Sequence, residues 1–167
     1  ILEGLSEGIN WIDTAHAYGF GVAETSVGKA LKEFKDDNVI VATKCGVLPE
    51  EDGKPKRFIS RGTILEEVDQ SLRRLRRDWI DLYQIHWPFP VENLTEAWET
   101  LIELKTIGKI RWAGVCNCWE TELDELQKVS PVTSNQPMYS MLDRKIEDKV
   151  LPWCETNNTG VLIYSPM

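Results

Sequence analysis

The fold is decided by the stretch Gly8-Ile-Asn-Trp-Ile-Asp13-Thr-Ala-His-Ala-Tyr18-Gly19-Phe-Gly21-Val-Ala-Glu24. An apolar run ends at Asp13, and a short loop then leads into a helical pattern, which indicates a β-strand followed by an α-helix. An open dinucleotide-binding sheet would place the fingerprint Gly-x-Gly-x-x-Gly in this turn. Gly19 and Gly21 supply two of its glycines, but Glu24 occupies the third position. The turn therefore favours a (β/α)8 barrel over a doubly wound open sheet.

The rest of the sequence repeats this unit. Short apolar or β-branched runs alternate with amphipathic segments of helical length, which is typical of a parallel sheet, and no antiparallel hairpin is expected. The six expected strands are residues 9–14, 39–44, 81–86, 111–115, 132–136 and 160–164. The expected helices are residues 24–34, 63–75, 94–107, 121–129 and 146–157, where Pro152 kinks or initiates the last, and residues 3–8 look like the end of another. We expect an α/β fold, a (β/α)8 TIM barrel with about six of its parallel strands, as a single domain over residues 1–167.

Composition excludes several classes of function. The 167 residues carry a formal net charge of -8, which disfavours nonspecific binding to nucleic acid or anionic membranes, because phosphate neutralisation requires clustered lysine and arginine. The longest apolar runs are residues 38–43 and 160–164, far below the roughly 20 residues that span a bilayer. No signal-peptide pattern begins the sequence, although its first residue is Ile1. We expect no membrane partner and no nucleic-acid partner.

The cysteines indicate a reducing compartment. They have neither the density of a secreted scaffold nor paired CxxC spacing, so reduced thiols and a cytoplasmic location are expected. Cys116 and Cys118 lack further ligands at zinc-finger spacing, and we expect no metal site. Cys45, beside Lys44, and Cys116 remain candidates for a reactive thiol, although no nucleophile elbow or dedicated histidine accompanies either. The cysteines are Cys45, Cys116, Cys118 and Cys154.

Polar side chains stand at the end of every expected strand. In a (β/α)8 barrel the carboxyl ends of the strands meet at one mouth, where this fold places its chemistry. We therefore expect these side chains to line a common site. They are Asp13, Lys44, His86, Cys116 with Asn117, Gln136, and Tyr164 with Ser165.

Four residues suggest acid–base chemistry at this mouth. Lys44 follows an apolar run, so its buried ammonium needs a partner, which Asp13 on the neighbouring strand can supply. Tyr18 lies in the loop after Asp13, and an ammonium near its phenol would favour the phenolate form. His86 stands among bulky neighbours in Tyr83-Gln-Ile-His86-Trp-Pro88. The alternatives are an Asx turn for Asp13, a structural ion pair or snorkelling for Lys44, and a satisfied core histidine for His86.

Other charged segments have simpler interpretations. The run Arg73-Arg74-x-Arg76-Arg77 closes a helical pattern that opens with Glu66-Glu67, and we interpret it as a solvated helix face. Residues 50–55 contain three acids, a glycine and a proline, and are expected to form a solvated loop. His16 is expected to be a loop histidine near the site rather than a ligand.

These motifs together resemble the aldo-keto reductase family over nearly the whole chain. The first stretch, residues 8–19, resembles the signature that carries the catalytic Asp and Tyr. Val41-Ala-Thr-Lys44 is similar to the lysine strand, Asp81-Leu-Tyr-Gln-Ile-His86 to the histidine strand, and Gly108-Lys-Ile-Arg-x-x-Gly114-Val-Cys-Asn117 to the fifth-strand motif. Residues 135–140 and 160–166 continue the similarity.

The resemblance implies a (β/α)8 barrel that reduces an aldehyde or ketone with NADPH, without a metal. Tyr18 would be the general acid, Asp13 and Lys44 would tune it, and His86 would orient the carbonyl. Asn117, Gln136 and Cys116, which replaces the family's usual Ser, would hold the nicotinamide carboxamide, with Tyr164 stacked on its ring and Ser165 near the phosphates. A thiol is a poorer donor than a hydroxyl, which weakens one of these hydrogen bonds.

The ends of the sequence also differ from the family pattern. No strand precedes the first helix, and the sequence stops before the segments that cover the pyrophosphate and choose between NADPH and NADH. We therefore expect the chain to be truncated at both ends, as part of a longer polypeptide or an inactive fragment. A nicotinamide-binding regulatory subunit and a thiol enzyme on the same barrel are the alternative functions. Oligomeric state and the particular carbonyl substrate are not predicted.

Overall fold

The main feature of the fold is a sheet of six parallel strands. The structure is a computed structural model that describes residues 1–36 and 38–167. Its strands follow the order β1-β2-β5-β6-β7-β8. Their bounds are β1 Trp11–Asp13, β2 Ile40–Cys45, β5 Ile80–Ile85, β6 Ile110–Cys116, β7 Ser134–Gln136 and β8 Gly160–Val161. The predicted α/β class and the expected six parallel strands are confirmed.

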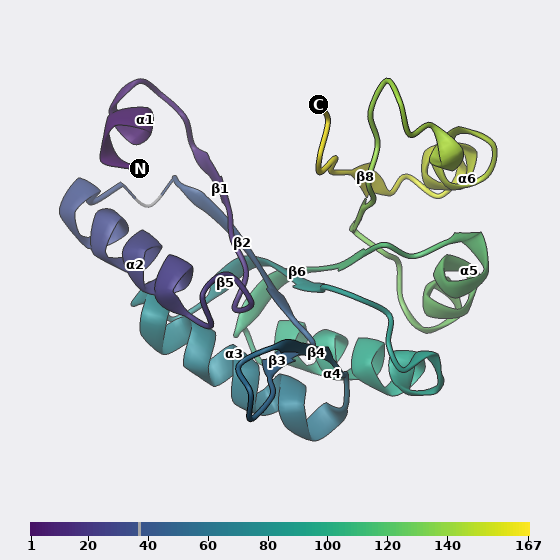
Figure 1. The fold of residues 1–167 in the computed structure, drawn as a ribbon, viewed down its shortest axis with the longest axis horizontal. Coiled ribbons are helices and arrows are strands. Elements are labelled where there is room, and N and C mark those ends of the chain that lie inside the picture. Colours follow the sequence, from purple (N-terminus) through teal and green to yellow (C-terminus); the bar gives the residue numbers. More distant parts are fainter. Residues whose placement is uncertain (37) are drawn as a thin grey trace.

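The helices lie along the outside of this sheet, which curls instead of lying flat (Figure 1). Within the described residues, β1 and β8 each pair on one side only, so the wall stays open between them. The longest helix described has 15 residues, and no helix in residues 1–36 and 38–167 could cross a membrane. The helices are α1 Leu2–Ser6, α2 Val22–Phe34, α3 Arg61–Leu75, α4 Leu94–Thr106, α5 Glu120–Val129 and α6 Val150–Thr156.

Side chains alternate between the two faces of each strand, so one set packs in the core and the other faces the concave side of the sheet. In β2, Val41 and Cys45 join the hydrophobic core, which the helices cover. Lys44 points the opposite way, as expected from the two-residue period of a strand, and its register partner in β5 is Gln84. Gln84 in turn pairs with Gly114 of β6. The concave side of the sheet therefore carries Lys44 and Gln84 near the ends of the strands.

The strand predictions were accurate for β2, β5 and β6 and too long for the other three. Of the strand expected at residues 132–136, only the three residues of β7 are extended, although β7 pairs on both sides. The strand expected at residues 9–14 has only the three residues of β1, and the one expected at 160–164 has only the two of β8. Tyr164 forms a separate bridge to Met138. Both strands are at an edge of the sheet, where pairing on one side alone leaves a shorter hydrogen-bonded run.

The prediction that no antiparallel hairpin is present was wrong. After β2, the chain forms a two-stranded antiparallel hairpin of β3 (Val47–Pro49) and β4 (Pro55–Arg57). Its turn contains Asp52-Gly53, with Gly53 at φ +78°, a conformation that glycine adopts without strain. The segment expected to be a solvated loop is therefore the exposed tip of an ordered hairpin.

The last helix is shorter than predicted. Residues 146–157 were expected to be helical, but a 3-10 turn at Lys145–Glu147 precedes α6, which begins at Val150. Pro152 lies in the first turn of α6, where a missing N–H costs little. Of the two roles considered for Pro152, initiation is the one observed.

The solvated-face interpretation of the arginine run was wrong for two of its four members. Arg74 donates to the fully buried Glu24 of α2 at 3.0 Å and lies 2.9 Å from Nδ1 of His16. Arg77 pairs with the buried Asp81 at 2.7 Å. These contacts arise because α2 packs against α3, so part of the arginine run faces neighbouring elements. His16 is buried in this cluster, outside the mouth of the sheet.

Candidate active site

A buried ion pair joins the ends of β1 and β2. Nζ of Lys44 lies 2.7 Å from Oδ2 of Asp13 and donates a second hydrogen bond to the carbonyl oxygen of Thr14 at 2.9 Å. The Lys44 side chain is fully buried, whereas that of Asp13 is 32% exposed. The salt bridge proposed from the sequence is present, and its carboxylate faces the mouth of the sheet.

Tyr18 and His86 lie next to this pair. Nζ of Lys44 is 5.2 Å from the centre of the Tyr18 ring. The Tyr18 and His86 rings meet edge to face, with centroids 6.0 Å apart and an interplanar angle of 82°. Tyr18 is 46% exposed, so its phenol is accessible from the open side. The structure brings all four predicted residues together.

His86 is a neutral imidazole at neutral pH. Its burial lowers the pKa to about 4, and the nearby Lys44 ammonium adds to this effect, while Asp13 opposes it. The backbone oxygen of His86 accepts a hydrogen bond from Nδ2 of Asn117 at 3.1 Å. This hydrogen bond ties the backbone at His86 to Asn117, and the ring carries no charge at neutral pH.

The amides predicted to bind a cofactor also reach this mouth. Nε2 of Gln136 donates to Oδ1 of Asp13 at 3.1 Å. The Tyr164 hydroxyl donates to Oδ1 of Asn117 at 2.9 Å. Sγ of Cys116 makes only a long contact of 3.8 Å with Oε1 of Gln136. Ser165 is exposed and follows Tyr164 in the chain, with no side-chain hydrogen bond in the described part of the structure.

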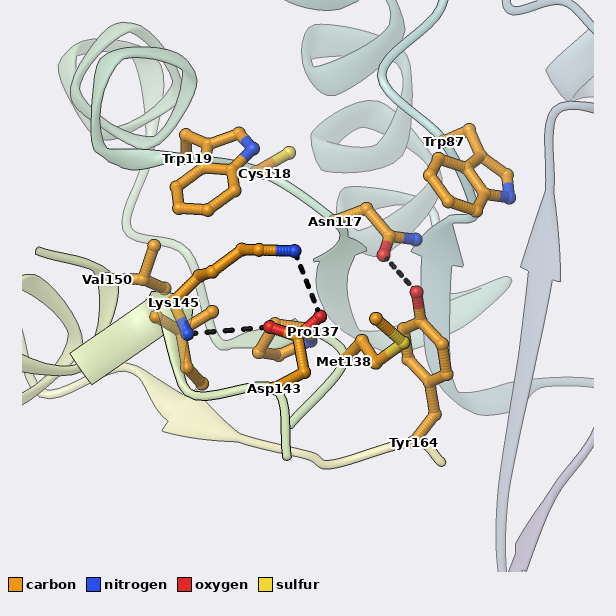
Figure 2. A pocket seen from close by; sticks show the side chains of 11 residues that line it. Trp87, Asn117, Cys118, Trp119, Pro137, Met138, Asp143, Lys145, Val150 and Tyr164 are labelled. Carbon is orange, nitrogen blue, oxygen red and sulfur yellow. Dashed lines mark hydrogen bonds and ion pairs between the residues drawn. The ribbon is translucent and has the colours of Figure 1, made fainter. Parts of the chain in front are cut away.

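A pocket of about 210 Å³ opens beside these groups. Figure 2 shows the Tyr164–Asn117 bond at one side of it and Lys145 with its partner Asp143, 3.2 Å apart, at the other. Two tryptophans contribute much of the apolar wall, Trp87 after β5 and Trp119 before α5. The pocket can therefore take a small molecule with apolar and hydrogen-bonding parts. Its lining includes Asn117 and Tyr164, whereas Asp13, Lys44, Tyr18 and His86 are not part of it.

The thiol alternative is not supported by this geometry. Cys45 and Cys116 are both buried, and burial is the main cause that raises the pKa of each thiol. A thiolate is the reactive form, so neither sulfur is prepared for nucleophilic attack. In residues 1–36 and 38–167, no group of three or more potential ligands could hold a metal ion.

Comparison with known proteins identifies the family of this chain. The family model described as "Aldo/keto reductase family" matches residues 3–167. The chain belongs to this family. The aldo-keto reductase YhdN of Bacillus subtilis is 44% identical over 168 residues, which are 100% of this chain and 50% of the relative. The NADH-specific methylglyoxal reductase of Escherichia coli is 40% identical, over 100% of this chain and 55% of the relative.

A solved structure confirms the fold of this aldo/keto reductase chain. The glycerol dehydrogenase of Gluconobacter oxydans is 42% identical and superposes with a TM-score of 0.90, over 96% of this chain and 50% of that protein. The curled six-stranded sheet thus corresponds to part of a (β/α)8 barrel. This chain spans about half the length of the curated relatives that it matches.

Glu67 is a buried carboxylate next to the candidate site that the sequence pattern does not reveal. Glu67 of α3 accepts hydrogen bonds from the backbone N–H of Gly46, at 3.2 and 3.0 Å to its two oxygens. Gly46 comes two residues after Lys44 and has φ +85°. Burial raises the pKa of Glu67 to about 8. Its position beside Glu66 was visible in the sequence, but nothing there indicated which of the two is buried.

The hairpin also brings a cation, Arg57, to the loop after β5, which the sequence pattern does not indicate. The guanidinium carbon of Arg57 in β4 lies 3.6 Å from the centre of a Trp87 ring. Asp52-Gly53 between two extended runs is a recognised hairpin signal, and it would have placed residues 55–57 on a strand. The contact itself depends on how the hairpin folds over the loop after β5.

Proposed function

We propose that the protein containing this chain is an oxidoreductase that reduces an aldehyde or ketone to an alcohol with NADPH. One observation carries the proposal, the meeting of Asp13, Lys44, Tyr18 and His86 at the mouth of the sheet. Membership of the aldo/keto reductase family supports it. Its partner is a small carbonyl compound, and no nucleic acid or membrane is involved.

In this proposal Tyr18 gives its phenolic proton to the carbonyl oxygen of the substrate. The Lys44 ammonium, 5.2 Å from the ring centre, stabilises the phenolate that remains. Asp13 keeps that ammonium charged in a buried place through the 2.7 Å pair. His86, which is neutral, donates a hydrogen bond that orients the same carbonyl oxygen, and Tyr18 regains its proton from solvent on the exposed side.

The side chains at the mouth fit the nicotinamide end of the cofactor. Asn117 and Gln136 provide amide donors and acceptors that complement a carboxamide, Cys116 lies between them, and the half-buried Tyr164 offers a ring face. Ser165 and Asp13 complete the set that we assign to this end of the cofactor. When bound, the nicotinamide supplies a hydride to the carbonyl carbon. NADPH is our choice from the family resemblance, while the name of the E. coli relative makes NADH the alternative.

Two further points belong to the proposal. We assign residues 1–167 to one (β/α)8 barrel domain, supported by the single hydrophobic core that joins the sheet and its helices. We also place the protein in the cytoplasm, in agreement with four buried cysteines that are all free thiols.

The test is turnover by the full-length protein. NADPH or NADH oxidation is followed with a panel of aldehydes and ketones, and carbonyl-dependent oxidation is expected. The Tyr18→Phe variant should lose at least about 100-fold in kcat while its affinity for the reduced cofactor, measured by fluorescence, changes little. Equal turnover by the wild type and the variant would refute the role of Tyr18. A wild-type protein that oxidises neither cofactor would refute the reductase assignment.

A further inference from the structure

A second cleft lies beside His86, on the side of the hairpin. It measures about 600 Å³ and is separate from the pocket of Figure 2, although Trp87 contributes to both. Its apolar lining comes from Val47, Pro55 and Phe89 together with Trp87. Its charged lining consists of two cations from β4, Lys56 and Arg57. The reacting end of the site therefore opens on one side to an apolar wall with positive charge.

Contact with Trp87 holds the Arg57 guanidinium in place, but its N–H donors make no hydrogen bond within the described residues. Its guanidinium stacks on Trp87 at 3.6 Å, which orients the plane and leaves the N–H groups along its edge free. None of the ion pairs or side-chain hydrogen bonds in residues 1–36 and 38–167 involves Arg57. The same holds for Lys56, whereas Lys54 in the same hairpin is bound to Asp52 at 2.6 Å.

The Arg57 charge faces the reaction site. Burial and Lys44 account for most of the fall in the pKa of His86, and Arg57 adds a smaller lowering. Burial raises the pKa of Tyr164, and Arg57 opposes this rise. Arg57 and His86 line the same cleft, and the Arg57 charge acts on His86 after β5 and on Tyr164 after β8, so the guanidinium lies on the side of the candidate site.

The net negative charge of the chain gives the Arg57 cation particular weight for the binding of an anionic substrate. With a net charge of -8, long-range forces repel an anionic substrate, so any affinity for one must come from a local group. Guanidinium groups bind carboxylates with two parallel charge-assisted hydrogen bonds, and stacking on Trp87 prepares Arg57 for this geometry. The apolar wall beside it suits a hydrocarbon or aromatic spacer.

We propose that Arg57, with Lys56 beside it, binds a carboxylate on the carbonyl substrate, so that the enzyme prefers carboxylate-bearing aldehydes or ketones with an apolar spacer. This inference rests on the proposed function, because the carboxylate site is defined relative to the carbonyl at Tyr18 and His86. It makes Arg57 a residue that determines specificity, without a part in proton transfer.

The experiment compares two aldehydes that share one aromatic skeleton on the full-length protein, and the ratio of their kcat/KM values is followed across variants so that their intrinsic reactivities cancel. The two aldehydes are 4-carboxybenzaldehyde and its methyl ester, which differ mainly in charge. We expect the wild type to favour the acid in kcat/KM, and this preference should shrink as ionic strength rises. The Arg57→Gln variant should lower kcat/KM for the acid by roughly 10-fold or more, mainly through KM, and for the ester by less than about 2-fold.

Two further variants distinguish a direct contact between Arg57 and the carboxylate from a general effect of positive charge on the hairpin. Arg57→Lys keeps the charge but loses the planar fork, so it should retain part of the preference. Lys54→Gln removes a charge from the same hairpin at a position already paired with Asp52, and it should leave the acid-to-ester ratio unchanged.

The possible results of this experiment distinguish failure of the carboxylate site from failure of the reductase function. An acid-to-ester ratio that Arg57→Gln leaves unchanged, or that Lys54→Gln lowers equally, would overturn the carboxylate site. Reduction of the ester without any wild-type preference for the acid would also overturn it, while leaving the reductase function standing. Absence of NADPH or NADH oxidation with both aldehydes would overturn the proposed function and this inference together.

Discussion

Lys44 and Asp13 form an ion pair of unequal burial, with 0% of the lysine side chain and 32% of the aspartate side chain exposed. The ammonium therefore depends on its partner more than the carboxylate does. Asp13 can be solvated from the mouth and also accepts from Gln136. The only other acceptor for Lys44 in the described residues is the carbonyl oxygen of Thr14.

This asymmetry predicts that the two sides of the pair respond differently to substitution. Asp13→Asn leaves a buried ammonium without its counter-charge and should lower the free energy of unfolding by about 3 kcal/mol. Lys44→Met fills the same space with an apolar chain and should cost less. Urea unfolding of the full-length protein measures both. A larger loss for Lys44→Met would contradict this account of the pair.

The neutral form of the His86 ring leads to a prediction about how kcat/KM depends on pH. Because burial and Lys44 lower its pKa to about 4, the ring stays neutral from pH 8 down to about 5. The profile of kcat/KM should therefore show no inflection near 6.5 caused by His86. NMR titration of the ring, assigned by its loss in His86→Gln, should show protonation only toward pH 4. Titration of His86 near 6.5 would mean that the ring is solvated.

Glu67 predicts a dependence of stability on pH. Its folded pKa of about 8 lies above the ordinary value of 4.5, so the folded state keeps a proton that the unfolded chain releases. The stabilisation it gives is complete below pH 4.5 and is lost as the pH rises through 8. Glu67→Gln stays neutral and still offers an acceptor to Gly46, so its free energy of unfolding should fall less between pH 5 and 9, by more than about 1 kcal/mol.

The matched control for that prediction is Glu66→Gln. Glu66 is the neighbour of Glu67 in the same helix and is exposed. Its charge is only a minor cause of the raised pKa of Glu67, so Glu66→Gln should keep most of the pH dependence of the wild type. Parallel stability curves for the wild type and Glu67→Gln would show that Glu67 does not hold a proton in the folded state.

Gly28 tests the contact between α2 and α3. A Cβ at this position would lie 2.1 Å from the carbonyl oxygen of Arg74, and backbone cannot move aside cheaply. Gly28→Ala should therefore destabilise the protein by about 2 kcal/mol or more. A Cβ at Gly62 of α3 would meet no atom of the described residues within 4 Å, so Gly62→Ala should be neutral or slightly stabilising. Equal thermal shifts for the two variants would rule out close packing at Gly28.

Much of the fold could be predicted because its signals are local. The central strands β2, β5 and β6 form near-continuous apolar runs, which a sheet covered by helices requires. The edge strands β1 and β8 were predicted too long, because their length depends on pairing that the sequence does not reveal. The hairpin after β2 was missed because its charged turn outweighed the Asp52-Gly53 signal.

The sequence by itself determined that Asp13, Lys44, His86 and Gln136 stand at or just after strand ends, because the register of an apolar run is a local property. Parallel strands then bring those ends together without further information. Only the tertiary structure decided which charges of the helices are buried. Glu67 and Arg74 belong to one exposed-looking helical pattern, yet both turn inward, since helix packing selects one face. It also decided that Arg57 lies on Trp87, because that contact joins the hairpin to the loop after β5, which are far apart in the sequence.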